Sequence, residues 1–274
     1  MDDIQPRSAA EDYSQFVPFS ARMMAAMRAR EASREDRLFH DPFAELLAGE
    51  EAFQRVDQQL TPQDQAYVAV RTRFFDDLIS HSKTDQIILL ASGLDTRAYR
   101  YPWHPGAKVY ELDYPEVLSY KAKLLKNTEP ACQHHLIPAD LTQPWKRKLL
   151  ESGYQPDSPS VWLIEGLLMY LLEAQVHYLL ETVSDLSSDD SWLGVDLINV
   201  KGLDYGPYEG YFRFGSDMPE ELLLEYGWQA EVFQPGDEGA NFGRYTEQYP
   251  GREVADVMRA FLVKAHKAST LSKQ

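Results

Sequence analysis

The middle of the chain alternates short apolar runs with helical segments, and this pattern limits the folds that it can adopt. Five runs, rich in β-branched or aromatic residues, end in a polar residue or a glycine: 86–93, 108–115, 134–140, 161–166 and 191–197. Helices are predicted between them at 116–126, 143–152 and 173–186. Such alternation is typical of a doubly wound α/β fold with a parallel sheet. Runs 230–234 and 260–267 predict two final strands, the last at an edge, which makes a mostly parallel sheet of seven strands.

The N-terminal part of the chain is predicted to be helical. Segment 20–48 has helical spacing of its apolar residues and predicts two short helices with a break near Phe39. Asp41 is the predicted N-cap of the second helix and Gly49 its C-cap. Segment 63–80 predicts another helix, because one stripe holds Tyr67, Val70, Phe74 and Leu78.

The length of 274 residues lies between the typical sizes of one domain and of two. The sequence has no repeat, no low-complexity run and no linker rich in proline, glycine or serine, so we expect one domain. Its predicted parts are an N-terminal helical cap (1–82), a sheet core (83–200), an aromatic-rich insertion (201–250) and a final strand with a tail (251–274).

Charge and cysteine content exclude several classes of protein. Lys and Arg number 27 against 43 Asp and Glu, a formal net charge of −16, which disfavours a binder of nucleic acid backbones. The single cysteine, Cys132, allows no intramolecular disulfide, and no metal site is predicted. The N-terminus lacks an apolar signal region, and the longest apolar stretch, 161–172, is too short for a bilayer. We therefore expect a soluble cytoplasmic protein with no nucleic acid or membrane partner.

Polar residues follow four of the predicted strands. Gly93 and Asp95 come after the first strand, Asp113 after the second, Asp140 after the third and Glu165 after the fourth. In an open α/β sheet, ligands bind beyond the carboxyl ends of the strands. A single carboxylate at such a place is more often a helix cap or a turn former. Four of them together favour a binding site.

The spacing of these residues indicates the kind of ligand. Asp113 follows Gly93 by 20 residues, about the interval at which an acidic residue holds the ribose of an adenosine cofactor. Loop 91–97, ASGLDTR, lacks two of the three glycines that a dinucleotide requires, and it carries an acidic residue where pyrophosphate would lie. S-adenosyl-L-methionine, which has no phosphate, suits this loop better.

Several motifs carry a resemblance to a known family. They are RTRFFDD (71–77), LLASGLDTRAYR (89–100), VYELDYPEVLSYK (109–121), PADL (138–141), VWLIEGLLMYL (161–171), GW (227–228) and FGRY (242–245). In this order they resemble the leucine carboxyl methyltransferase superfamily, and most closely its bacterial branch of S-adenosylmethionine-dependent O-methyltransferases of the polyketide type. The resemblance runs from about Ser20 to Lys267. It implies a Rossmann-like methyltransferase sheet in which the insertion forms a lid over the acceptor.

The resemblance also implies roles for residues around the cofactor. Arg71 is similar to the arginine that pairs with the carboxylate of S-adenosylmethionine, and Glu165 to the acidic residue that faces its amino group. Gly93 would let the methionine part approach the backbone. Arg22 is the candidate for a further basic contact from the N-terminal helix, with Arg28 as second choice.

The adenosine end of the cofactor is assigned in the same way. The resemblance implies that Asp113 holds the ribose hydroxyl groups and that Asp140, with the backbone of Leu141, brackets the adenine. Asp95 is a further cofactor candidate at the end of the first strand. Tyr114 is a candidate to stack on the adenine, although core packing is an alternative for it and for Tyr110.

For some other residues the sequence leaves two interpretations open. Arg97 is either a functional residue or a brace that pairs with a neighbouring carboxylate. Arg73 and Asp76 are expected to form a solvated pair on one helix. The aromatic residues of 201–250 are either core or a lid that shapes the acceptor site, for which the candidates are Tyr205, Tyr208 and Tyr211.

The sequence therefore predicts an S-adenosylmethionine-dependent O-methyltransferase with a small-molecule acceptor. A carboxylate acceptor is already ionised and needs no base, whereas a hydroxyl benefits from one. No histidine lies at a strand end, which favours a carboxylate or an acidic phenol, and a Tyr or Asp of 201–250 stays open as a base. The alternatives are a nucleotide-dependent oxidoreductase of Rossmann type and a non-catalytic binding protein on the same fold. The sequence specifies neither the acceptor nor the oligomeric state.

Overall fold

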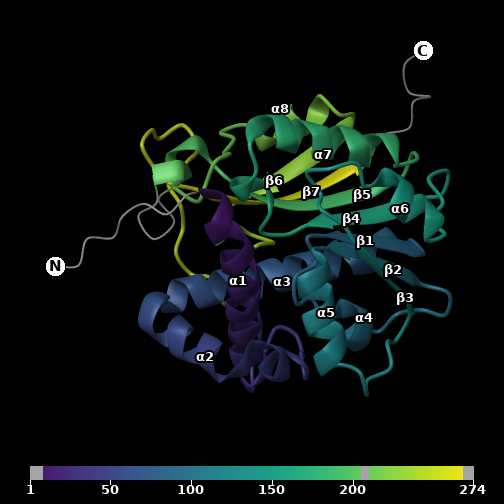
Figure 1. Cartoon of the computed structure of the whole chain (residues 1–274). Helices are drawn as coiled ribbons and strands as arrows, with labels where there is room; N and C mark the ends of the chain where they lie inside the picture. Colours follow the sequence, from purple (N-terminus) through teal and green to yellow (C-terminus); the bar gives the residue numbers. More distant parts are fainter. Residues whose placement is uncertain (1–8, 205–209, 268–274) are drawn as a thin grey trace, which may run out of the picture.

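The computed structural model describes residues 9–204 and 210–267 (Figure 1). Its centre is one seven-stranded sheet with the strand order β3-β2-β1-β4-β5-β7-β6. The strands are β1 (Gln86–Leu90), β2 (Lys108–Asp113), β3 (Gln133–Pro138), β4 (Ser160–Ile164), β5 (Trp192–Ile198), β6 (Trp228–Phe233) and β7 (Ala260–Lys267). The first five are parallel, and β7 pairs antiparallel with both β5 and β6. The predicted seven-stranded, mostly parallel sheet is confirmed.

The predicted position of the last strand is wrong. Strand β7 lies inside the sheet, between β5 and β6, and β6 forms the edge. Phe261, Leu262 and Val263 are all buried, so both faces of β7 pack against the core. Strand β6 exposes Gln229 and Glu231 to solvent, as an edge strand can. Apolar residues on both faces are typical of an interior strand, and this was the signal that the interpretation missed.

Helices cover both faces of the sheet, which makes the fold doubly wound (Figure 1). Helices α3 (Pro62–Ser82), α4 (Arg97–Arg100) and α5 (Pro115–Leu124) lie on one side, and α6 (Lys146–Glu151), α7 (Glu173–Asp185) and α8 (Pro219–Leu224) on the other. Strand β1 shows how the core divides, because Ile87 and Leu89 pack in the cluster that holds Phe74 of α3. Ile88 and Leu90 pack in the cluster of α6 and α7. Successive side chains of a strand point to opposite faces, so each strand serves both cores.

Two helices, α1 (Ala9–Ala32) and α2 (Ala44–Gln59), form the N-terminal cap. The predicted break near Phe39 lies between them. The predicted C-cap at Gly49 falls at a kink within α2: Gly49 is not helical, with a φ of 67° and a ψ of 160°, so it ends the first helical stretch, and the helix resumes directly after it. An added Cβ at Gly49 would lie 3.1 Å from Nη2 of Arg22, so the kink also makes room for that side chain. Asp41 is not the N-cap, a position that Phe43 holds, but its Oδ1 accepts a hydrogen bond from the Phe43 amide.

The segment predicted as an insertion contributes to the sheet as well as to the binding face. Short 3-10 helices η1 (Leu168–Tyr170) and η2 (Val200–Asp204) precede α8 and β6. Tyr205 and Tyr208 lie outside the described residues.

Within residues 9–204 and 210–267, none of the helices combines the length and the apolar character that crossing a bilayer requires.

Candidate functional site

A cavity of about 1030 Å³ lies at the carboxyl ends of the central strands, with walls from α1, α3 and the loops that follow β1, β2 and β4. Most sequence-predicted residues come together in its lining: Arg71, Gly93, Asp95, Asp113, Tyr114 and Glu165. The parallel strands bring these loops to one edge of the sheet, as expected. Ligand pockets typically measure about 300–1,000 Å³, so this cavity can hold a cofactor together with an acceptor.

Asp113 and Gly93 form the centre of the predicted ribose site. The Asp113 carboxylate accepts hydrogen bonds from the amides of Gly93 (2.6 Å) and Tyr114 (2.6 Å). Burial raises the pKa of this carboxyl, and the two amide donors oppose that rise. Gly93 has a φ of 52°, in the left-handed region that glycine adopts without strain. The loop is therefore shaped by a carboxylate that also faces the cavity.

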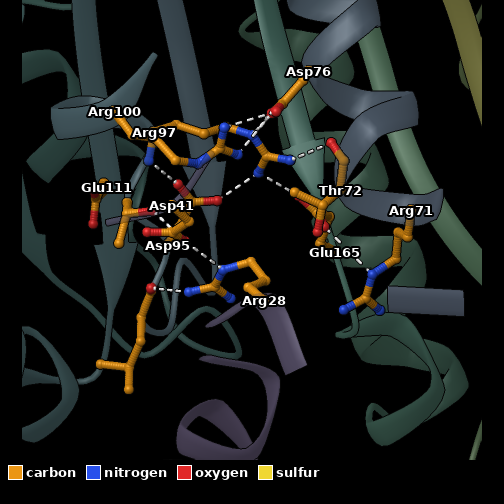
Figure 2. A network of polar contacts seen from close by, with 12 residues as sticks. Arg28, Asp41, Arg71, Thr72, Asp76, Asp95, Arg97, Arg100, Glu111 and Glu165 are labelled. Carbon is orange, nitrogen blue, oxygen red and sulfur yellow. Dashed lines mark hydrogen bonds and ion pairs between the residues drawn. The ribbon is translucent and has the colours of Figure 1, made fainter. Parts of the chain in front are cut away.

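Arg97 joins the loop after β1 to helix α3 (Figure 2). Its Nε donates to Asp76 at 2.7 Å, and its Nη1 donates to Asp95 and to Glu165, each at 2.5 Å. Only 2% of Arg97 is exposed. The interpretation of Arg97 as a brace is thus confirmed, and the two carboxylates that it holds, Asp95 and Glu165, line the cavity.

The predicted solvated pair of Arg73 and Asp76 is wrong. Asp76 is buried and accepts hydrogen bonds from Arg97 and from both terminal nitrogens of Arg100. Arg73 pairs instead with Asp77, with 2.8 Å between Nε and Oδ1. Asp76 lies on the face of α3 that packs against α4, a contact that spacing along one helix does not reveal.

Arg71 lies on the opposite side of Glu165 from Arg97. Its Nη1 donates to Asp196 at 2.7 Å, and its Nε lies 3.4 Å from Oε1 of Glu165. Burial opposes the charge on Arg71, but the carboxylates of Asp196 and Glu165 outweigh burial and raise its pKa. The guanidinium is therefore a permanent buried cation at the cavity wall.

Asp196, on β5, belongs to the candidate site, and sequence reasoning missed it. It is fully buried and yet belongs to the cavity lining. The signal was a carboxylate inside the otherwise apolar strand 192–198, where a charge is costly unless it is paired.

The structure places three predicted cofactor residues outside the cavity lining: Arg22, Asp140 and Leu141. Arg22 donates to the carbonyl of Ala48 at 2.9 Å and pairs with Glu51. Arg28 lines the cavity instead, because six residues along a helix correspond to a rotation of about 240°. Asp140 accepts hydrogen bonds from the amide and the hydroxyl of Thr142, so it acts as a turn former.

The two tyrosines near β2 have different surroundings. Tyr110 is fully buried and stacks on His135, with 4.7 Å between ring centroids, so its core reading is confirmed. Tyr114 is 41% exposed and lines the cavity next to Asp113, so it is not a core residue. Burial and the neighbouring Asp140 raise the pKa of Tyr114.

The remaining walls are mainly apolar. Five of the seven methionines line the cavity: Met23, Met24, Met27, Met169 and Met258. Phe212, Tyr245 and Tyr249 line it from the aromatic-rich segment, whereas Tyr211 does not. The unbranched, polarisable methionine side chain adapts to irregular shapes, which suits a wall around an apolar ligand.

The described residues match the groups of S-adenosylmethionine. The Nε of Arg71 and the hydroxyl of Ser92 are buried and find no hydrogen-bond acceptor or donor within the described part of the chain. The Arg71 donor suits a carboxylate, Glu165 and Asp95 suit an ammonium group, and Asp113 suits hydroxyl groups. Within the two described ranges, no three His, Cys, Asp or Glu residues are grouped in a way that could hold a metal ion.

The chain was compared with families of known proteins and with individual relatives. Residues 21–184 match the family model of leucine carboxyl methyltransferase. A protein of Mycobacterium sp. (strain KMS), assigned by name to the S-adenosyl-L-methionine-dependent methyltransferases, is 33% identical over 284 residues, which cover 92% of this chain and 95% of the relative. A protein of Parafrankia sp. (strain EAN1pec), named in the same way, is 35% identical over 233 residues and covers 79% and 71% of the two chains.

Solved structures share the fold. A crystal structure from Thermobifida fusca, titled as a methyltransferase, matches with a TM-score of 0.59 and 18% identity over 91% of this chain and 94% of that chain. A DUF574 family protein from Streptomyces avermitilis matches with a TM-score of 0.56 and 12% identity over 90% and 97% of the chains. These comparisons do not support the oxidoreductase or the non-catalytic alternative. The chain belongs to the leucine carboxyl methyltransferase family and is an S-adenosylmethionine-dependent methyltransferase.

Proposed function

We propose that this enzyme methylates an oxygen atom, a carboxylate or an acidic phenol, on a mostly apolar, polyketide-like small molecule. The observation that carries the proposal is the composition of the cavity wall. All seven histidines lie among the described residues, and none of them lines the cavity, while methionine and aromatic side chains make up much of it. An acceptor that brings its own negative charge needs no base from the protein.

The residues proposed to hold the cofactor divide into two groups. Arg71 would bind its carboxylate and Glu165, with Asp95, its ammonium group. Asp113 would accept hydrogen bonds from the ribose hydroxyl groups, while Gly93 leaves room beside the backbone. When bound, S-adenosylmethionine supplies an electrophilic methyl group on a sulfonium centre. The protein then contributes by holding the acceptor oxygen in line with that methyl group and by excluding water.

Two tyrosines of the cavity, Tyr67 and Tyr249, are poor bases. Tyr67 donates its hydroxyl to Asp196 at 3.0 Å, and burial together with the Asp196 carboxylate raises its pKa well above the ordinary value. Burial and Tyr245 raise the pKa of Tyr249 in the same direction. Neither phenol is therefore poised to take a proton from an alcohol near neutral pH. A carboxylate loses its negative charge on methylation, and an apolar wall favours a step in which opposite charges disappear.

Ligand binding gives the first test. Thermal unfolding is followed with saturating S-adenosylhomocysteine and, separately, with NAD. A ligand that binds only the folded state raises the free energy of unfolding, by about 2.7 kcal/mol at 100 times its Kd, and therefore raises the melting temperature. We expect S-adenosylhomocysteine to stabilise the protein and NAD to leave it unchanged. Stabilisation by NAD alone would contradict the assignment.

Product chemistry tests the acceptor. Apolar carboxylic acids, phenols and aliphatic alcohols are incubated with methyl-labelled S-adenosylmethionine, with the Asp113→Ala protein as control. A methyl ester releases labelled methanol in mild base, whereas a methyl ether does not. We expect label in carboxylic acids or acidic phenols and none in aliphatic alcohols. Labelling of the aliphatic alcohols alone, or of a ring carbon of the phenols, would refute the proposal.

A further inference from the structure

Asp196 connects three elements below the cavity. Its Oδ2 accepts from Nη1 of Arg71 at 2.7 Å and from the hydroxyl of Tyr67 at 3.0 Å, both on α3. Its Oδ1 accepts from the amide of Gly166, just after β4, at 2.5 Å. The residue is fully buried. A charge in this place is expensive unless each partner is present, so the arrangement holds its partners in one geometry.

The contact leaves part of the Arg71 guanidinium directed toward the cavity. Asp196 takes Nη1, while Nε has no hydrogen-bond acceptor in the described part of the chain and Nη2 contacts only the Met24 sulfur, at 3.7 Å. Gly166 contributes space, because an added Cβ would lie 3.3 Å from Nη1 of Arg71. The donors that remain can meet a carboxylate in the cavity.

Arg71 divides its charge between two carboxylates, because it pairs with Glu165 as well as with Asp196. The Nε of Arg71 lies 3.4 Å from Oε1 of Glu165, too poorly aligned for a hydrogen bond, while Oε2 of Glu165 is held by Arg97 at 2.5 Å. If Asp196 lost its charge, Glu165 would remain as the carboxylate partner of Arg71, and the two side chains would draw closer together. The cation and the anion would then neutralise each other and would no longer be available to a ligand that carries both charges.

We infer that Asp196 is a positioning residue that shares the charge of Arg71 with Glu165, so that Arg71 and Glu165 both stay available to the amino-acid end of S-adenosylmethionine. The inference rests on the proposed function, in which Arg71 holds the carboxylate of the cofactor. Asp196 itself acts through Arg71 and leaves the adenosine end of the cofactor untouched.

Two ligands distinguish positioning from a general structural role. S-adenosylhomocysteine carries the amino-acid end, whereas 5′-methylthioadenosine has the same adenosine and thioether without it. Dissociation constants of both are measured by titration calorimetry for the wild type and for Asp196→Asn. We expect Asp196→Asn to weaken S-adenosylhomocysteine binding about tenfold or more, the effect of losing a charged hydrogen bond. Binding of 5′-methylthioadenosine should stay within about twofold of the wild-type value.

Glu31→Gln is the matched control. Glu31 is also a buried carboxylate, 5% exposed, that pairs with an arginine, Arg244, and accepts from a backbone amide, that of Leu38. Neither Glu31 nor Arg244 lines the cavity. This variant should lower the melting temperature without changing the ratio of the two dissociation constants. A ratio that changes equally in Glu31→Gln and Asp196→Asn would overturn the inference.

Arg71→Met separates the inference from the proposal on which it rests. If Arg71→Met leaves the ratio unchanged, the proposed role of Arg71 fails. If it changes the ratio and Asp196→Asn does not, only the positioning role fails. The variant that combines Arg71→Met with Asp196→Asn should show the same ratio of dissociation constants as Arg71→Met alone. A further change in this ratio would overturn the inference, because it would mean that Asp196 contacts the ligand independently of Arg71. Should Asp196→Asn not fold, Gly166→Ala provides the second test, because its Cβ would lie 3.3 Å from Nη1 of Arg71 and would shift that nitrogen by a few tenths of an ångström. We expect a smaller loss of the same selectivity, while the melting temperature reports the strain of alanine at a φ of 65°. An unchanged ratio there overturns the inference.

Discussion

The carboxylate of Asp113, at the end of β2, accepts a hydrogen bond from the amide of Gly93, beyond the end of β1, with 2.6 Å between Oδ2 and the nitrogen. Strands β1 and β2 are parallel neighbours in which Leu90 pairs with Leu112. The 20 residues between Gly93 and Asp113 therefore end in a direct contact. This contact fixes the shape of the first loop and holds the carboxylate at the cavity wall.

Asp113→Ala should weaken S-adenosylhomocysteine binding by roughly 10- to 100-fold, because one charged acceptor for hydroxyl groups is lost. Titration calorimetry measures the change. Asp85→Ala is the control, since its side chain is 75% exposed at the opposite end of β1. Equal affinities of the two variants would contradict the assignment of Asp113 to the ribose.

Glu165→Gln should weaken cofactor binding more than Glu181→Gln does. Glu165 lies between Arg97 and Arg71 at the cavity wall, and burial raises the pKa of its carboxyl while both arginines oppose this. Glu181 is exposed on α7. We expect roughly tenfold weaker binding for Glu165→Gln and no change for Glu181→Gln, measured by the Kd of S-adenosylhomocysteine. Identical values would show that the residue after β4 does not contact the cofactor.

Arg97→Met should destabilise the fold as well as the site. The substitution leaves the buried Asp76 with one arginine fewer and releases Asp95 and Glu165. Breaking a buried ion pair costs about 3–5 kcal/mol, which corresponds to a loss of roughly 10 °C in melting temperature for a chain of this size. Arg147→Met, at a side chain that is 88% exposed, should change the melting temperature by less than about 1 °C. A small effect of Arg97→Met would refute its role as a brace.

Protonation of the Asp95 carboxylate in acid should lower the free energy of unfolding. Burial alone would raise the pKa of its carboxyl, but Arg97, Arg100 and Arg28 outweigh burial and lower the pKa to about 2, from an ordinary value of 3.8. The unfolded chain then binds the proton more tightly, so the stabilisation is complete above about pH 4 and declines as the pH falls toward 2.

Urea unfolding at pH 5 and at pH 3 tests this. The difference in unfolding free energy between the wild type and Asp95→Asn should shrink by about 1 kcal/mol between the two pH values. A difference that stays constant would mean that the pKa of Asp95 is the same in the folded and unfolded chain.

Local patterns in the sequence determined where the helices and strands of this protein lie and which polar residues gather at the carboxyl ends of its parallel strands. Strands with period two, helices with a period near 3.6 and polar residues after each strand are properties of neighbouring residues, so they can be read along the chain. Because parallel strands end at one edge, Gly93, Asp95, Asp113, Asp140 and Glu165 are predicted to lie together, and all of them except Asp140 line the cavity.

The tertiary structure alone decided which side chains face that edge and what neutralises them. Arg71 and Asp196 are 125 residues apart, and only the packing of α3 beside β5 brings them within 2.7 Å. Packing also decides that Arg28 and not Arg22 lines the cavity, because this depends on how α1 is rotated against the sheet. It likewise decides that β7 lies between β5 and β6. These contacts depend on how whole elements pack, and burial then makes the pairing of each charge obligatory. Periodicity records which face of an element is apolar, but it does not record which element covers that face.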